Sequence, residues 1–142
     1  MKTNFETPTL LLQNLLKQKK VSKFSSIVFV SSISGIICSA TGISIYSASK
    51  GAISSIIRVL AQELANNKIR VNAVCPGMVK TEMTMNNTTY TKEQLEYDEK
   101  NNYPLGYGTP EDVALSISFL LSDASSWITG TNLIIDGGAS TH

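Results

Sequence analysis

Short apolar runs alternate with longer helical patterns along this chain, and this alternation limits the folds available to it. Apolar runs bounded by turn residues are typical of buried strands, and they predict strands at Ser26–Ser31, Ile69–Cys75 and Asn132–Asp136. The helices are expected at Pro8–Lys19, Ser44–Asn66 and Pro110–Leu121. Strands that alternate with helices form a parallel sheet with right-handed crossovers. The predicted fold class is therefore α/β.

The last of these helices has a well-marked start. Thr109 is expected to cap it, and Pro110 suits its first turn. The acidic residues that follow lie near the positive end of the helix dipole. The segment from Glu82 to Tyr107, which is polar and rich in Asn, Thr and Tyr, is predicted only as a polar connection.

Tyr46 and Lys50 carry the clearest chemical signal. They are four residues apart, so they lie on one face of the expected helix. A free tyrosine has a pKa of about 10, and its phenolate is therefore costly at neutral pH unless a neighbouring cation stabilises it. Taken alone, this spacing is that of an ordinary surface pair. Beside a polar strand end, it predicts a site of proton transfer.

Two strand ends supply that context. Ser32 closes the first predicted strand and lies fourteen residues before Tyr46. The second strand runs into Pro76 and Gly77, a break that makes a tight turn with exposed backbone groups. Strand ends are where α/β folds place their ligands.

In this order, the motifs closely resemble the signature of the short-chain dehydrogenase/reductase family: a strand-end serine, then Tyr-x-x-x-Lys, then Asn-x-x-x-Pro-Gly-x-x-x-Thr. Asn72, Pro76, Gly77 and Thr81 fit the last pattern. The resemblance continues through YPLGYGTPEDVA and ITGTNLIIDGG, so it covers almost the whole chain. It implies that residues 1–142 form one partial domain, the C-terminal part of a Rossmann-like, doubly wound parallel sheet.

The resemblance also implies an activity, which is hydride transfer between a nicotinamide and a small carbonyl or alcohol substrate. Tyr46 would be the general acid that protonates the carbonyl oxygen, or the base in the opposite direction. Lys50 would stabilise the phenolate and bind the nicotinamide ribose. Ser32 would hold the substrate oxygen. Its neighbours Ser31 and Ser34 are alternatives, because the loop to Tyr46 is one residue longer than in many relatives.

Asn4 matches the fourth catalytic position of the family, an asparagine that orders a water molecule for proton relay to the lysine. The gap of 28 residues to Ser32 is typical of the family. The alternative is that Asn4 caps the following helix, because Asn is a favoured cap. The residues expected to bind the cofactor are Tyr46, Lys50, Pro76, Gly77, Val79 and Thr81. Without the resemblance, Thr81 would be an ordinary helix cap.

The glycine-rich turn that cradles dinucleotide phosphates in this family has no counterpart in the sequence. Family members place their first strands before the position of Asn4, so the chain is expected to be the second half of such an enzyme. The cofactor is expected to be NAD or NADP, and the missing half would choose between them. Residues 82–107 would form the mobile substrate lid, which leaves the substrate open.

One basic cluster stands out in KQKKVSK, and it consists of Lys17, Lys19, Lys20 and Lys23. Fatty-acid-synthesis reductases of this family use basic residues nearby to receive an acidic acyl carrier protein, so a carrier protein is a candidate partner. The favoured alternative is simpler. Lysines near a helix C-terminus interact with its dipole and stay in solvent.

The composition excludes several other classes of protein. A length of 142 residues, 42% hydrophobic residues and a net charge of +1 suit one globular domain without nucleic-acid binding. No apolar run approaches a membrane span, and the first residues are too polar for a secretory signal. No membrane partner is expected, and a cytoplasmic location is predicted. Cys38 and Cys75 are expected to be reduced structural thiols, with no disulfide or metal site.

Two functions stay open at this point. The chain is either an NAD(P)-dependent oxidoreductase that needs its nucleotide-binding half, or a catalytically inactive remnant. The remnant would self-associate through its two long helices, as relatives do, and a homo-oligomer is expected. The predicted sheet also leaves the strand Ser26–Ser31 as an open edge.

Overall fold

Three parallel strands form the centre of the protein. The computed structural model describes residues 1–38, 40–86 and 90–141. Within them, β1 (Ser26–Val30), β2 (Arg70–Pro76) and β3 (Asn132–Ile135) pair in the order β1-β2-β3. The predicted α/β fold with a parallel sheet is therefore confirmed, and each predicted strand is found within one residue of its expected ends.

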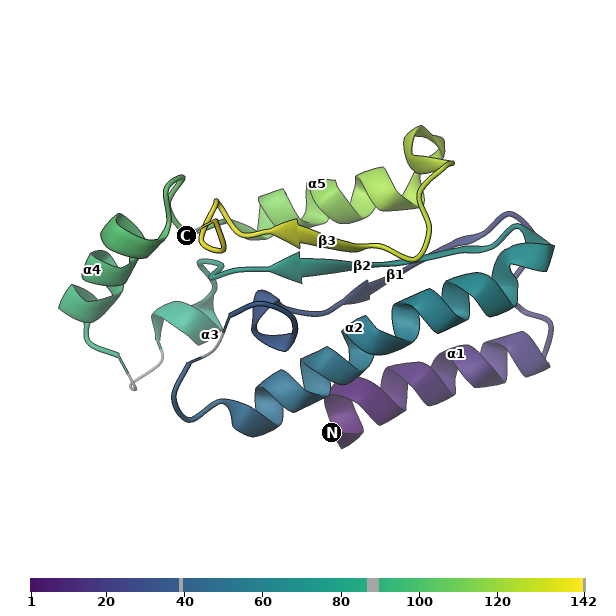
Figure 1. Ribbon diagram of the computed structural model, residues 1–142, viewed down its shortest axis with the longest axis horizontal. Coiled ribbons are helices and arrows are strands. Elements are labelled where there is room, and N and C mark those ends of the chain that lie inside the picture. Colours follow the sequence, from purple (N-terminus) through teal and green to yellow (C-terminus); the bar gives the residue numbers. More distant parts are fainter. Residues whose placement is uncertain (39, 87–89, 142) are drawn as a thin grey trace.

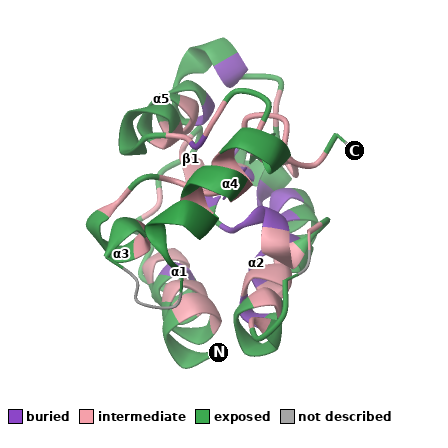
Figure 2. Ribbon diagram, turned by 90° about the vertical axis from the view of Figure 1, so that its left-hand side faces the viewer, coloured by how far each residue is buried: buried purple, intermediate pink, exposed green. Residues whose placement is uncertain are grey.

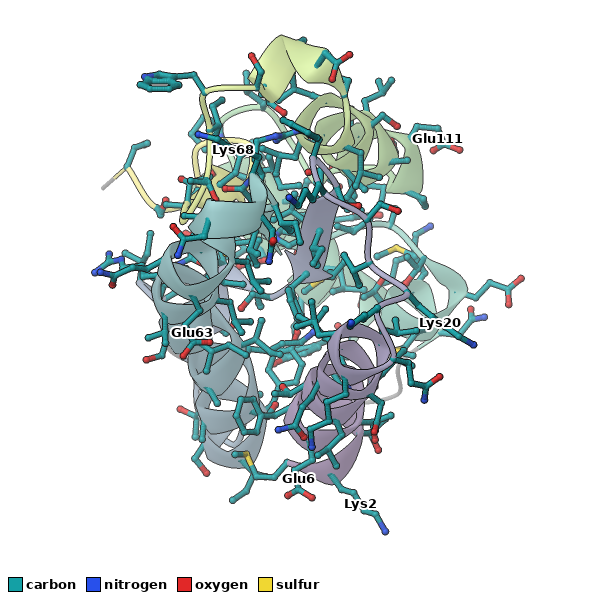
Figure 3. All side chains as sticks on the ribbon, turned by 90° about the vertical axis from the view of Figure 1, so that its right-hand side faces the viewer. Lys2, Glu6, Lys20, Glu63, Lys68 and Glu111 are labelled. Carbon is teal, nitrogen blue, oxygen red and sulfur yellow. The ribbon has the colours of Figure 1, made fainter. Side chains whose placement is uncertain are left out.

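Helices cover both faces of the sheet. Figure 1 shows α1 (Thr7–Lys17) and α2 (Ser44–Leu64) on one face and α5 (Pro110–Leu121) on the other. Figure 3, seen from the end where loops lead into the strands, shows side chains filling the space between α1 and α2. Because the three strands are parallel, their carboxyl ends all lie at one end of the sheet.

The core lies between the sheet and the helices α1 and α2. Ile53, Ile57, Ala61 and Leu64 recur at helical spacing along α2 and are all buried, so one face of this helix packs inward. They meet Leu12 of α1 together with residues of β1 and β2. The strand β2 is buried along residues 71–75, as expected for the central strand of a sheet covered on both faces.

Asn72 is a polar residue at the centre of this apolar strand, where it is fully buried. Its side-chain amide donates a hydrogen bond to the carbonyl oxygen of Ile128 over 3.0 Å, and its side-chain oxygen accepts one from Thr131 N over 3.1 Å. Asn72 thus joins β2 to the loop that leads into β3. Its place in the family signature therefore has a structural basis, because both amide groups are satisfied.

The N-terminal helix begins earlier than predicted. A π-helical turn, Lys2–Glu6, leads directly into α1. The alternative role of Asn4 as a helix cap is therefore wrong, because Asn4 lies inside the helical turn and not before it. This turn was not predicted, because its sequence KTNFE is polar and lacks the apolar periodicity from which helices are predicted.

Two helices in the polar segment were also missed by the sequence analysis. These are α3 (Glu82–Met85) and α4 (Lys92–Asn102). Each begins with a threonine capping box, and so does α5, where the predicted cap Thr109 is confirmed. Figure 2 shows α4 as a largely exposed helix at the end of the molecule. With no buried residue of its own, α4 gives no amphipathic pattern.

Both cysteines are free thiols, with Cys75 buried and Cys38 partly buried. Burial raises the pKa of each thiol. For Cys38 the nearby Asp136 carboxylate adds to the effect. Both thiols are therefore poorer nucleophiles than ordinary ones. Among the helices of the described residues, none is long and apolar enough to cross a membrane.

Candidate active site

The predicted site residues lie at the end of the sheet where the parallel strands terminate. Ser32 follows β1, and Pro76 and Gly77 close β2. Tyr46 and Lys50 lie in the first turns of α2, which packs against β2 and the short 3-10 helix η2 (Ile33–Gly35). The arrangement agrees with the rule that open α/β sheets bind ligands at the carboxyl ends of their strands.

Gly35 sets the distance between η2 and α2. A Cβ atom at this position would lie 2.6 Å from Gly51 N and 2.7 Å from the carbonyl carbon of Lys50. Only glycine therefore allows this close backbone contact. Because Ser32 caps η2 and Lys50 lies on α2, the contact fixes the serine relative to the lysine.

The structure distinguishes Ser31 from Ser32 among the candidate serines. The hydroxyl of Ser31 donates to the carbonyl oxygen of Lys50 over 2.9 Å and shares a 2.7 Å hydrogen bond with Ser54 Oγ. Ser31 therefore joins the end of β1 to α2, and its hydroxyl proton is not free for a substrate. Ser32 Oγ accepts a hydrogen bond from Ser34 N over 3.2 Å. Its own proton has no acceptor among the described residues, so Ser32 can donate to a substrate oxygen.

Tyr46 and Lys50 lie on the same face of α2, as predicted. The Lys50 ammonium is 5.9 Å from the centroid of the Tyr46 ring, and it donates to the carbonyl oxygen of Val30 over 2.9 Å. Burial lowers the pKa of Lys50, because desolvation disfavours its charged form. The Tyr46 side chain is 42% exposed. Its hydroxyl is therefore accessible to a ligand from the solvent side.

Asn4 contacts α2 through Ser49, which was not among the predicted site residues. Its side-chain amide donates to Ser49 Oγ over 3.1 Å, and Ser49 Oγ donates to the carbonyl oxygen of Tyr46 over 2.7 Å. Asn4 therefore braces the turn of α2 between Tyr46 and Lys50. No sequence signal identified Ser49, because a serine inside a helix is common and its contact comes from a distant segment.

The loop after β2 is held by backbone contacts. Gly77 packs so tightly that an added Cβ would lie 3.0 Å from Asp136 Cβ. Val79 forms an isolated bridge with Gly108, in which Lys80 N donates to Gly108 O over 2.8 Å. The N–H of Val79 has no acceptor among the described residues, which leaves it available to a ligand. Thr81 caps α3 by accepting a hydrogen bond from Thr84 N over 3.2 Å.

Polar contacts join α4 and the residues that follow it to the loop after β2. Glu99 pairs with Lys80 over 2.6 Å and accepts a hydrogen bond from Tyr107 N over 3.0 Å. The Tyr107 hydroxyl donates to Asp98 Oδ2 over 2.5 Å, and burial together with this carboxylate raises the pKa of Tyr107. Tyr103 accepts a hydrogen bond from Met78 N over 3.3 Å. The sequence pattern Thr-x-x-Gln at residue 91, a capping-box signature, could have revealed α4.

The predicted basic cluster lies away from the carboxyl ends of the strands. Residues 17–23 precede β1, so they lie at the end of the strand opposite to Ser32. Figure 3 shows Lys20 there, and Lys68 on the loop that leads into β2. A carrier-protein partner stays a prediction.

Known proteins are similar to this chain in sequence and in fold. Residues 1–140 match a protein family described as enoyl-(acyl carrier protein) reductase. A tropinone reductase homolog of Arabidopsis thaliana is 40% identical over 143 residues, which cover 100% of this chain and 52% of that protein. A short chain dehydrogenase family protein from Francisella tularensis has a TM-score of 0.85 and 33% identity, over 98% of this chain and 60% of that chain. The chain belongs to the short-chain dehydrogenase/reductase family.

A second solved member of similar structure is a 4-hydroxyisoleucine dehydrogenase complexed with NADH and succinate. It has a TM-score of 0.83 and 33% identity, and the match covers 98% of this chain and 56% of that one. The chain thus spans about half the length of the short-chain dehydrogenases and reductases that it matches.

The contact at Gly35 allows a direct test of the site geometry. We expect Gly35→Ala to lower the free energy of unfolding by about 1–3 kcal/mol, because the added methyl group meets backbone atoms that cannot move aside. Urea unfolding of the chain joined to a nucleotide-binding half would measure this. Ser34→Ala, one residue away, should change stability by less than about 0.5 kcal/mol. Equal midpoints for the two variants would contradict the tight contact.

Proposed function

We propose that the chain supplies the catalytic half of an NAD(P)-dependent oxidoreductase, which transfers a hydride between a nicotinamide and a small carbonyl or alcohol substrate. The observation that carries this proposal is the convergence of Ser32, Tyr46 and Lys50 beside one strand end. Ser32 has a hydroxyl proton without an acceptor among the described residues, Tyr46 has an exposed phenol, and Lys50 has an ammonium group. Carbonyl reduction needs this combination, since a proton must reach the oxygen as hydride reaches the carbon.

The residues present suit one end of such a cofactor. The Val79 N–H has no acceptor among the described residues, so it could meet the oxygen of a carboxamide. The Lys50 ammonium could meet ribose hydroxyls, and Pro76, Gly77 and Thr81 would line the same region. When bound, the nicotinamide supplies or accepts the hydride. Nothing in these residues distinguishes NAD from NADP.

Each catalytic residue has a separate task in the proposed reaction. Ser32 donates a hydrogen bond to the substrate oxygen and so orients it. Tyr46 gives its hydroxyl proton to that oxygen during reduction, or removes the proton during alcohol oxidation. Lys50 stabilises the resulting phenolate by its charge. Asn4 acts through Ser49 as a positioning residue that holds the helical turn between Tyr46 and Lys50.

The test is to join the chain to the part of the Arabidopsis tropinone reductase homolog that it does not match. The fused protein should oxidise NADH or NADPH in the presence of a panel of small ketones and aldehydes, followed by absorbance of the reduced cofactor. Absence of turnover in a folded fusion that binds the cofactor would favour the inactive remnant.

Lys50→Ala in this fusion should move the pH profile of alcohol oxidation to higher pH. The variant loses the cation that stabilises the phenolate, so a lower proton concentration is needed to form it. The measurement is kcat/KM against pH. Lys50→Arg keeps the positive charge and should shift the profile less than the alanine variant. Identical profiles for the alanine variant and the parent would contradict the role of Lys50.

The chain alone should bind NAD(H) and NADP(H) very weakly. Members of this fold class hold the pyrophosphate at a glycine-rich turn and helix N-terminus, and the sequence shows no such turn. Titration calorimetry should therefore give no saturation up to about 1 mM, which corresponds to less than about 4 kcal/mol of binding free energy. Micromolar affinity would contradict this expectation and indicate another anion site.

A further inference from the structure

Polar side chains from three different elements meet in the layer between the sheet and α2. Ser31 follows β1, Ser54 lies on α2, and Asn132 begins β3. The hydroxyl oxygens of Ser31 and Ser54 are 2.7 Å apart, and both residues are buried. Asn132 Nδ2 donates to the carbonyl oxygen of Ser54 over 3.1 Å. These contacts join the end of β1, α2 and β3 at one point.

The direction of the bond between the two serines follows from the other contact of Ser31. A hydroxyl has one proton to donate, and Ser31 donates to the carbonyl oxygen of Lys50 over 2.9 Å, so Ser54 donates to Ser31 Oγ. A serine inside a helix often bonds to the carbonyl four residues before it, which for Ser54 is that of Lys50. Here Ser31 supplies the bond to that carbonyl, and the Ser54 hydroxyl bonds to the end of β1.

Lys50 is therefore held both by its backbone and by its side chain. Its carbonyl accepts from Ser31, and its ammonium donates to the carbonyl oxygen of Val30 over 2.9 Å. Ser31 is itself anchored to the central strand, because Ser31 N donates to Val74 O over 2.8 Å. The position of the ammonium thus depends on how closely α2 is held to the end of β1.

We propose that Ser54 is a positioning residue of the active site, whose hydroxyl holds α2 to Ser31 and so keeps the Lys50 ammonium in place beside Tyr46. Asn132 supports this contact from β3 through the carbonyl of Ser54. The inference rests on the proposed function. It adds a residue that is buried and acts on the reaction only through Lys50.

The alternative is a purely structural role, since buried hydroxyls need hydrogen bonds in any case. Two observations favour positioning. The network reaches the carbonyl of Lys50 itself, and it does so from the residue directly before Ser32, which would hold the substrate oxygen. A loosened contact would change the distance between groups that must act together, and a displacement of about 1 Å can lower a rate about 100-fold.

Ser54→Thr and Ser54→Val test the hydroxyl in the chain joined to a nucleotide-binding half. The two new side chains have the same shape, so they add the same bulk and differ only in the hydroxyl group. Ser54→Val should lower kcat about five- to tenfold relative to Ser54→Thr, the range expected for one lost hydrogen bond. KM for the carbonyl substrate should stay within about twofold, because Ser32 keeps its place before η2.

Two alanine variants complete the comparison. Ser54→Ala removes the hydroxyl without adding atoms, so it tests the contact even where the larger side chains prevent folding. It should lower kcat relative to the parent by the same about five- to tenfold. Ser55→Ala is the matched control, since Ser55 is the next residue of α2 and is exposed. It should keep kcat within about twofold of the parent.

Coupling to Lys50 gives a readout that a general loss of stability does not move. In Ser54→Ala the pH profile of alcohol oxidation should shift to higher pH, in the direction expected for Lys50→Ala but by less. In a Lys50→Ala background, Ser54→Ala should cause no further shift, because the group through which it acts is gone. Equal shifts in both backgrounds would overturn the inference, and so would a threonine variant as impaired as the valine variant.

Hydrogen exchange tests the same contact without cofactor or substrate. In Ser54→Ala the amides of residues 48–54 should exchange at least about fivefold faster than in the parent, while those of residues 58–64 keep their rates. Local opening in a parent fusion that shows no turnover would uphold the placement of Lys50 by Ser54 and contradict the proposed function. An active parent whose exchange and kcat are unchanged by Ser54→Ala would overturn this inference alone.

Discussion

Tyr46→Phe is expected to lower kcat at least about 100-fold in the chain joined to a nucleotide-binding half, the effect typical of losing a general acid. Phenylalanine keeps the ring and its packing but removes the transferable proton. The loss should therefore appear in the chemical step, measured by single-turnover kinetics. Cofactor affinity should barely change, because the ring stays in place.

A matched control is available on the α4 helix. Tyr97 is also exposed, at 69%, and its ring takes no part in the site. Tyr97→Phe should leave kcat within about twofold of the parent, as expected for a surface change that breaks no contact. If Tyr46→Phe retained near-normal turnover while binding cofactor normally, Tyr46 could not be the acid.

The elements that were predicted correctly have strong local signals. The helix α2 has an apolar residue at every turn, from Ile53 to Leu64, and β2 is an uninterrupted buried run. The helix α5 begins with Thr109 and Pro110, whose capping preference depends only on their own backbone. In these segments local preference and tertiary packing agree, so the pattern is readable without the structure.

The features that were missed depend on contacts between distant segments. The helix α4 is mostly polar and is held by the ion pair of Glu99 with Lys80 and by the hydrogen bond of Asp98 with Tyr107. Asn4 contacts Ser49, a residue 45 positions away. These contacts leave no periodic pattern in the sequence, so the capping box at Thr91 was the one local sign of α4, and the polar segment was predicted only as a connection.

In the active site, too, local features could be predicted from the sequence and contacts between distant segments could not. The spacing of Tyr46 and Lys50 was sufficient to predict that they share a helix face, because helical geometry alone decides it. The choice among Ser31, Ser32 and Ser34 required the structure, because it depends on which hydroxyl is already engaged. The hydroxyl of Ser31 is already engaged with Lys50 and Ser54, whereas that of Ser32 donates to no described residue. The bond from Lys50 to Val30 was likewise beyond the sequence.

The chain alone is expected to self-associate or to lose fixed tertiary structure, because the open edge of β1 is apolar and uncharged. Ser26–Val30 contains no proline or lysine that would discourage pairing, and natural proteins avoid such edges because they recruit other chains. Light scattering should show oligomers or aggregates, and the thermal transition should be broad. Addition of a nucleotide-binding half should give a compact complex with a sharp transition.

Two valines of similar exposure distinguish edge pairing from helix pairing as the cause of this association. Val30 lies at the open edge and is 48% exposed, whereas Val59 lies on α2 and is 54% exposed. Val30→Lys places a charge at the edge, a change that natural edge strands use against association, and it should shift the scattering toward monomer. Val59→Lys should leave the association unchanged if the edge is responsible. The reverse result would assign association to the helices, and a monodisperse parent with a sharp thermal transition would mean that the β1 edge does not recruit other chains.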